Sequence, residues 1–325
     1  FVVVTGVLVW SGLAQAATIN VPGSYTTIQA AIDAATTGDT VLVNSGTYTE
    51  SVFINKRITL VGAGSNSTTI TASDLGATNT VTFDGSNAMD AAISGFKITG
   101  ATGSGDTGNG IYCKSGADPI ITNNLISGNS TGIYCFSSSP AITNNTVSGN
   151  SGYGIYCNSS SPIITGNTIS GNSNHGIYCD SSSSPTITDN TITGNSYGIV
   201  CNSSSPTITN NTISGNSYSG IHCNSSAPTI TNNIISGNTV HGIYYEWSSS
   251  PTISNNTISG NSGFGSGCYY SSFGTITNNQ ITGNSSHGIY CYNSSSPIIT
   301  DNTITGNNHG VVCAYAAPTI TNNQI

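Results

Sequence analysis

The most constraining feature of this sequence is a repeat of 22 to 23 residues that occupies most of its length. A Gly-Ile-Tyr-Cys motif and its variants mark each copy, and the interval is 22 residues except for two intervals of 23 after Gly242 and Gly265. The ten copies begin at Gly110, Gly132, Gly154, Gly176, Gly198, Gly220, Gly242, Gly265, Gly288 and Gly310. A fixed period of this length indicates a solenoid, in which each repeat stacks on its neighbours.

Each repeat contains three short stretches with the pattern of β-strands. Most copies carry Pro-x-Ile-x-x-Asn-x-Ile-x-x-Asn, as from Pro206 to Asn216, and this segment keeps the same length in every complete copy. Length varies only between Cys and Pro and between Asn and Gly, as expected for turns at two corners. Side chains alternate across a strand, so Ile and Cys should point inward while Tyr and Thr point outward. We therefore predict an all-β fold, a single right-handed parallel β-helix with three strands per coil.

Stacked coils predict vertical columns of like side chains. One interior column holds Ile121, Ile142, Ile164, Ile187, Ile208, Ile230, Ile253, Ile276, Ile299 and Ile320. Another holds Asn124, Asn145, Asn167, Asn190, Asn211, Asn233, Asn256, Asn279, Asn302 and Asn323. We expect each Asn amide to bond to the coils above and below and thereby to satisfy buried polar groups. Asn also tolerates the left-handed backbone of sharp corners.

All nine cysteines fall in one column, where Tyr245 fills the only gap. An odd number of cysteines at one per coil is not a disulfide framework, so we interpret the column as a buried stack of small apolar thiols. A metal–thiolate chain is the alternative, but the sequence has no Cys-x-x-Cys pairs that would converge on one ion. The column members are Cys113, Cys135, Cys157, Cys179, Cys201, Cys223, Cys268, Cys291 and Cys313.

The chain divides into four predicted segments. Residues 1–16 resemble the end of a signal peptide, with Ala17 as the mature start, although a buried N-terminal strand is an alternative. Residues 17–62 should form a cap helix and the first coil, with Thr26 and Gln29 as a capping box. Residues 63–108 read as irregular coils, and residues 109–325 as regular coils truncated in mid-coil.

Charge is sparse, with four Lys plus Arg against twelve Asp plus Glu. Lys56, Arg57, Lys97 and Lys114 are the only Lys and Arg residues, so the coils after Lys114 lack the cations that would neutralise a row of phosphates. This excludes nucleic acid as a favoured partner. The apolar run at the N-terminus is too short and too interrupted to span a membrane. We expect a secreted or cell-surface protein, as a monomer or part of a longer chain.

Several segments resemble pectin-lyase-like β-helix proteins. They are Ile19–Pro22, Thr27–Ile32, Gly46–Glu50 and Ile93–Ile98. The Asn-Asn-Thr-Ile-Ser-Gly-Asn coils are similar to carbohydrate-binding and sugar-hydrolase β-helix repeats, including NosD-type proteins. The resemblance implies the fold and contact with polysaccharide. It does not choose an activity, because the superfamily includes lyases, hydrolases, esterases, epimerases and non-catalytic proteins.

The sequence departs from each catalytic pattern of that superfamily. There is no Arg beyond Arg57, and the acids of the regular coils are mostly several coils apart. General acid–base chemistry requires two titratable groups near one bond, and Glu246, His222 and His241 are the best available candidates. No cofactor is indicated, and a Ca²⁺ site has no support from the acidic residues.

An aromatic cluster between the seventh and ninth coils is the best candidate for carbohydrate binding. It contains Tyr244, Glu246, Trp247, Tyr270, Tyr290 and Tyr292. Aromatic faces stack on the apolar patches of sugar rings, although an outward aromatic ladder also stabilises a sheet by stacking on itself. The predicted function is non-catalytic contact with polysaccharide or cell-surface glycan. The alternatives are a polysaccharide lyase, hydrolase or epimerase, an ice-binding protein with outward Thr-x-Thr pairs, and a structural stalk or adhesin.

Overall fold

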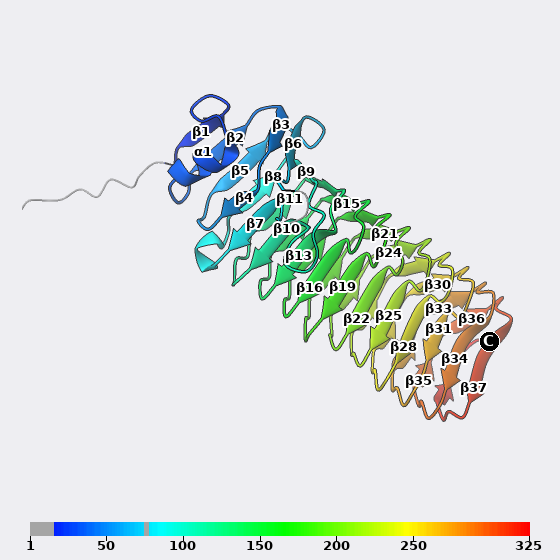
Figure 1. Cartoon of the computed structure of the whole chain (residues 1–325). Coiled ribbons are helices and arrows are strands. Elements are labelled where there is room, and N and C mark those ends of the chain that lie inside the picture. The colour runs from blue at the N-terminus through cyan, green and yellow to red at the C-terminus, as the bar shows by residue number, and fades with distance from the viewer. Residues whose placement is uncertain (1–15, 75–77) are drawn as a thin grey trace, which may run out of the picture.

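The computed structural model describes residues 16–74 and 78–325. These residues form a parallel β-solenoid of three long sheets with one short α-helix near the N-terminus. The sheets contain 14, 12 and 12 strands, so the solenoid has about fourteen turns. Figure 1 shows the strands stacked side by side along an elongated rod. The predicted fold class is confirmed.

Each coil from β2 to β37 contributes one strand to each sheet, whereas the end strands β1 and β38 belong to the 14-stranded sheet alone; we name the sheets A, B and C. Sheet A contains the Pro-x-Ile strands: β1 Thr18–Val21, β2 Thr40–Val43, β5 Thr59–Gly62, β8 Ala92–Ser94, β11 Ile120–Thr122, β14 Ala141–Thr143, β17 Ile163–Thr165, β20 Thr186–Thr188, β23 Thr207–Thr209, β26 Thr229–Thr231, β29 Thr252–Ser254, β32 Thr275–Thr277, β35 Ile298–Thr300 and β38 Thr319–Thr321. Sheet B follows in each coil: β3 Gly46–Thr49, β6 Thr68–Thr71, β9 Lys97–Thr99, β12 Leu125–Ser127, β15 Thr146–Ser148, β18 Thr168–Ser170, β21 Thr191–Thr193, β24 Thr212–Ser214, β27 Ile234–Ser236, β30 Thr257–Ser259, β33 Gln280–Thr282 and β36 Thr303–Thr305. Sheet C carries the Gly-Ile-Tyr-Cys motif: β4 Val52–Ile54, β7 Val81–Asp84, β10 Asn109–Lys114, β13 Thr131–Phe136, β16 Ile155–Asn158, β19 Ile177–Asp180, β22 Ile199–Asn202, β25 Ile221–Asn224, β28 Ile243–Glu246, β31 Ser266–Cys268, β34 His287–Tyr292 and β37 His309–Ala314.

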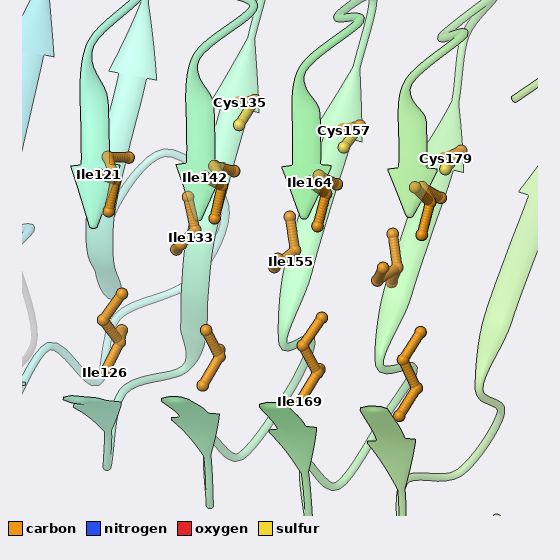
Figure 2. Close-up of a cluster of buried hydrophobic side chains, with 14 of the residues drawn as sticks. Ile121, Ile126, Ile133, Cys135, Ile142, Ile155, Cys157, Ile164, Ile169 and Cys179 are labelled. Atoms are coloured by element: carbon orange, nitrogen blue, oxygen red, sulfur yellow. The ribbon is translucent and has the colours of Figure 1, made fainter. Parts of the chain in front are cut away.

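Residues one repeat apart are direct partners in the sheets. Cys135 pairs with Cys157, and Ile142 pairs with Ile164, in parallel register. Figure 2 shows these Ile and Cys side chains projecting into the interior from successive coils. The Ile and Cys columns are buried almost without exception, whereas the Tyr side chains lie on the outer face of sheet C. Stacking of the coils therefore buries a continuous apolar core.

The predicted Asn ladder is present at the corner between sheets A and B, where its side chains bond to the backbone of neighbouring coils. The Oδ1 atom of Asn211 accepts from the backbone N–H of Asn190, and its Nδ2 donates to the backbone oxygen of Ile187. A second Asn ladder, which includes Asn150 and Asn172, spans the corner between sheets B and C. The left-handed residue at the first corner is not the ladder Asn but the one before it, such as Asn210 with φ 58°. The ladder Asn is inward because its side chain caps the turn that its neighbour makes.

A third ladder lies at the corner between sheets C and A, where the sequence analysis identified none. The Oγ of Ser183 accepts from the backbone N–H of Ser160 and donates to the carbonyl of Cys157. Buried serines recur at this place in eight coils: Ser138, Ser160, Ser183, Ser204, Ser226, Ser249, Ser272 and Ser295. Ser-rich turns hide this ladder in the sequence because the inward Ser is surrounded by exposed ones.

The cysteine column consists of free thiols, and eight of the nine are buried while Cys313 is exposed. The neighbouring Cys135 thiol, together with burial, raises the pKa of Cys157 well above its ordinary value. Because the thiolate is the reactive form, these cysteines should be inert in the folded protein. We expect Ellman's reagent to titrate about one thiol in the native protein and all nine after denaturation. Rapid native titration of several thiols would contradict the interior placement of the column.

The N-terminal helix α1 Ile28–Ala34 covers the first coils, and its capping differs from the prediction. The cap is Thr27 rather than Thr26, and its hydroxyl accepts from the backbone N–H of Ala30. The capping box is wrong because the Gln29 side chain bonds to the backbone of Phe53 in the next coil. The first-turn N–H groups of Ile28 and Gln29 are instead satisfied by the carboxylate of Glu50.

Two further predictions concern the N-terminal half. The predicted signal-peptide remnant lies outside the described residues except for its last residue, Ala16. Strands β6, β7, β8 and β9, together with the short 3₁₀-helix Ser86–Ala88, belong to residues 63–108, and these strands continue the three sheets. In the part of the chain that the structure describes, no helix has the length and apolar character needed to cross a membrane.

Candidate carbohydrate-binding surface

The outer face of sheet C carries two neighbouring columns of aromatic rings. One column uses the Tyr of Gly-Ile-Tyr-Cys, and Tyr134 stacks on Tyr156 with ring centroids 4.7 Å apart. The other uses the residue before that Gly, where His241 stacks on Phe264 at 4.5 Å with an interplanar angle of 6°. Stacked contacts of this kind recur along both columns and cover the faces of these rings. Most of the aromatic surface is therefore a self-stacking ladder, which stabilises the sheet.

Trp247 and Tyr270 depart from this ladder because they lie at the corner after sheet C. Their rings stack at 4.5 Å with an interplanar angle of 14°, and Trp247 remains 53% exposed. Both residues have left-handed backbones, with φ 55° and 51°, at a position that Ser occupies in most other coils, including Ser225. A bulky side chain is unfavourable in this conformation. Two strained aromatic residues side by side, of which Trp247 is exposed and Tyr270 partly buried, indicate a role other than folding.

Glu246 lies beside this aromatic pair and is held by two donors. The hydroxyl of Tyr244 donates to one carboxylate oxygen at 3.0 Å, and Nε2 of His222 lies 3.2 Å from the other. Burial lowers the pKa of His222 despite the opposing effect of Glu246, so a neutral imidazole with its proton on Nε2 fits this bond. Burial and Glu246 raise the pKa of Tyr244 far above its ordinary value. The carboxylate is thus a fixed hydrogen-bond acceptor at the edge of the aromatic patch.

His241, the third of the weak catalytic candidates, has a different environment. It stacks between Phe264 and Tyr244, and its Nδ1 accepts the backbone N–H of Phe264 at 3.0 Å. Burial lowers the pKa of His241 to about 4, which keeps the ring neutral near pH 7. The structure therefore joins Glu246 to His222, while His241 meets this network only through the ring of Tyr244.

The remaining predicted sugar-binding residues lie on the following coils. Tyr292 contacts Tyr270 edge to face at 6.3 Å, and Tyr290 stacks on Phe264 at 4.8 Å. Tyr269, which the sequence analysis did not choose as a site residue, connects the patch because its ring lies 4.9 Å from Tyr244 and 5.9 Å from Tyr270. We call the resulting cluster the Trp247 patch. Its members are Tyr244, Glu246, Trp247, Tyr269, Tyr270, Tyr290 and Tyr292.

A row of polar side chains leads to the Trp247 patch, and the sequence analysis did not identify it. The outward residue after the Cys position is Asn158, Asp180, Asn202 and Asn224 in four successive coils, and Glu246 in the fifth. The Asn202 amide donates to the Asp180 carboxylate at 2.9 Å. The signal was present in the repeat, since this position changes from Phe136 to amides and acids and then to aromatic residues.

Two other features of the sequence are the His287–His309 pair and the outward Thr pairs. His287 and His309 have ring centroids 5.0 Å apart, the spacing expected for adjacent coils, and the His287 ring lies 5.4 Å from that of Tyr290 at the border of the patch. The outward Thr pairs lie on sheet A and include Thr186, Thr188, Thr207 and Thr209. Ice binding by this array stays a prediction, since outward Thr is also favourable strand chemistry.

The chain is a right-handed parallel β-helix protein, and residues 175–325 match the model for a right handed beta helix region. Residues 32–219 match the model of the periplasmic copper-binding protein NosD, and the chain belongs to this family. The described residues form no group of three or more His, Cys, Asp or Glu suited to a metal ion. The eight buried thiols, and Nδ1 of His241, which already accepts a backbone N–H, are not available as copper ligands in this fold.

One curated relative is a cell surface glycoprotein of Methanothermus fervidus, which is 34% identical over 118 residues. The match covers 36% of this chain and only 18% of that protein. The A-module of the Azotobacter vinelandii mannuronan C-5 epimerase AlgE6 has a similar structure, with a TM-score of 0.72, 20% identity and coverage of 90% of this chain and 94% of that one. The catalytic domain of a GH87 alpha-1,3-glucanase in complex with nigerose has a TM-score of 0.62 and 15% identity, and the match covers 93% and 67% of the two chains. At these identities the structural matches show the fold.

Proposed function

We propose that this protein is a secreted or cell-surface β-helix protein that binds polysaccharide through the Trp247 patch without cleaving it. The observation that carries this proposal is the stacked pair Trp247 and Tyr270 at left-handed corner positions. A sequence that folds equally well with Ser at this corner has no folding reason to use Trp. An exposed aromatic platform with a fixed carboxylate beside it matches what sugar rings and their hydroxyls require.

The non-catalytic part of the proposal rests on the spacing of the carboxylates. Glycoside hydrolysis uses two carboxyl groups about 5 to 9.5 Å apart. Asp180 precedes Glu246 by three coils in the same row, which corresponds to about 14 Å at roughly 4.8 Å per coil. The nearer partners of Glu246 are the neutral His222 and the phenol of Tyr244, and both donate hydrogen bonds to it.

The comparisons support the location and the ligand class. The curated relative is a cell surface glycoprotein, and two of the structural neighbours are named for action on mannuronan and on alpha-1,3-glucan. The two structural neighbours share the β-helix fold with this chain and use it on a polysaccharide. We extend this use of the fold, but not the reactions, to the present chain.

Replacing Trp247 with Ser should weaken polysaccharide binding by at least about tenfold, equivalent to about 1.4 kcal/mol. The substitution removes the exposed ring and copies Ser225, which has the same left-handed backbone one coil earlier. Folding should not suffer, since Ser is already used at this corner. Affinity electrophoresis in gels that contain single soluble polysaccharides measures the effect.

Phe136→Ser is the matched control, because Phe136 is 41% exposed on sheet C but lies five coils from Trp247. It should leave retardation unchanged. Equal retardation of wild type and Trp247→Ser would contradict the role of the patch. New reducing ends or unsaturated sugars after incubation, if lost in Glu246→Gln, would overturn the non-catalytic part of the proposal.

A further inference from the structure

The polar row that leads to the Trp247 patch has the form of a binding track. Asn158, Asp180, Asn202, Asn224 and Glu246 follow one another in five coils, and each is partly exposed. The row runs parallel to the rod axis, because partners in neighbouring coils stack directly. Figure 1 shows the corresponding strands β16, β19, β22, β25 and β28 side by side along the rod. The row ends at Glu246, next to the exposed ring of Trp247.

Hydrogen-bonding capacity along this row remains unused close to Trp247. Oδ1 of Asp180 accepts two hydrogen bonds, from the backbone N–H of Ser181 and from the Asn202 amide. Asn224 differs, since its Oδ1 accepts from the hydroxyl of Ser225 while its Nδ2 has no partner among the described residues. The amide N–H groups of this partly exposed residue are therefore unpaired, one coil before the carboxylate of Glu246. Such donor and acceptor pairs suit sugar hydroxyl groups.

The charge of the row excludes an acidic ligand. No Lys or Arg follows Lys114, and the amine of Lys114 lies 3.2 Å from the carboxylate of Asp84. Asp180 and Glu246 are negative within the row, and the whole chain has a formal net charge of −8. A polyuronate would bring a row of carboxylates onto this surface without a cation to meet them. Like charges brought together in this way oppose binding, and counterions only partly screen them.

The spacing of the row matches a sugar chain along the rod. Parallel coils repeat every ~4.8 Å, and one pyranose unit of an extended glycan advances by a similar length. Resting on the proposed function, we infer that the ligand is a neutral polysaccharide that lies along the axis with about one sugar ring per coil, from Asn158 to the Trp247 patch. Successive rings then meet the same kind of side chain in each coil.

The charge inference is tested by affinity electrophoresis of the full chain with two panels of soluble polymers at low ionic strength. The neutral panel contains laminarin, dextran, starch and xyloglucan, and the acidic panel contains alginate and polygalacturonate. We expect retardation by at least one neutral polymer and none by the acidic ones. Retardation by a polyuronate that equals or exceeds that of every neutral polymer would overturn the inference but leave the proposed function intact. Absence of retardation by both panels would instead defeat the proposed function.

The orientation of the bound glycan along the rod axis is tested with oligosaccharides of the neutral polymer that binds. A ligand along the axis should gain affinity with each added ring up to about five rings, because the row spans five coils. Asn224→Ser removes both amide donors without adding a charge beside Glu246, and it should weaken binding of the longest oligosaccharide at least about threefold while leaving the melting temperature unchanged. Affinity that stops rising at two rings, or an Asn224→Ser variant with wild-type affinity, would overturn the axial placement.

Discussion

Asn211→Ala should lower the free energy of unfolding by about 3 to 5 kcal/mol, since buried groups that lose their partners cost roughly 1 to 3 kcal/mol each. The Oδ1 of Asn211 accepts from the backbone N–H and the side-chain Nδ2 of Asn190, and its own Nδ2 donates to the backbone oxygens of Ile187 and Thr209. The side chain is only 1% exposed, so water cannot replace it. Alanine therefore removes the partner of the buried Asn190 N–H and a partner of the Ile187 carbonyl.

The neighbouring Asn210 provides the control for this prediction. It is exposed and has φ 58°, so Asn210→Gly keeps the left-handed corner and removes no buried bond. We expect the melting temperature of Asn210→Gly, followed by circular dichroism, to stay close to wild type while that of Asn211→Ala falls by several degrees. Two equal melting temperatures would show that the amide ladder does not stabilise this corner.

The sequence predicted the fold because a strict period leaves little freedom in register. Once Cys135 is placed over Cys157, every other column follows, including the Asn ladder that was later found in the structure. The Ser ladder was missed because inward and outward Ser look alike in a polar turn. The capping of helix α1 was missed because Glu50, more than twenty residues away, supplies the carboxylate that meets its first turn.

The candidate site was only partly predictable for a related reason. Sequence located Trp247 and its aromatic neighbours as a departure from the repeat, but it could not show which rings are covered by others. Stacking hides the faces of Tyr134 and Tyr156, whereas Trp247 stays 53% exposed because it lies at the corner. The strain at this position depends on the backbone φ of the corner, which composition does not reveal. The structure adds Tyr269 and the polar row to the aromatic cluster that the sequence predicted.

Gly154→Ala should destabilise the solenoid by about 3 kcal/mol. Overpacking a rigid core costs roughly 1 to 3 kcal/mol, and the upper end applies where the added methyl group clashes with backbone atoms. A Cβ at Gly154 would lie 2.6 Å from the backbone oxygen of Gly176 in the next coil and 2.8 Å from the Cγ2 of Ile169. The same close approach recurs at the other Gly-Ile-Tyr-Cys glycines, so the motif requires Gly for packing between coils and not for turning.

Gly149→Asn is the control, since Gly149 has φ 63° and open space around its Cβ position, and Asn tolerates that backbone. We expect urea unfolding to begin at a clearly lower concentration for Gly154→Ala only; matching curves for both variants would mean that the coils can separate enough to admit a methyl group.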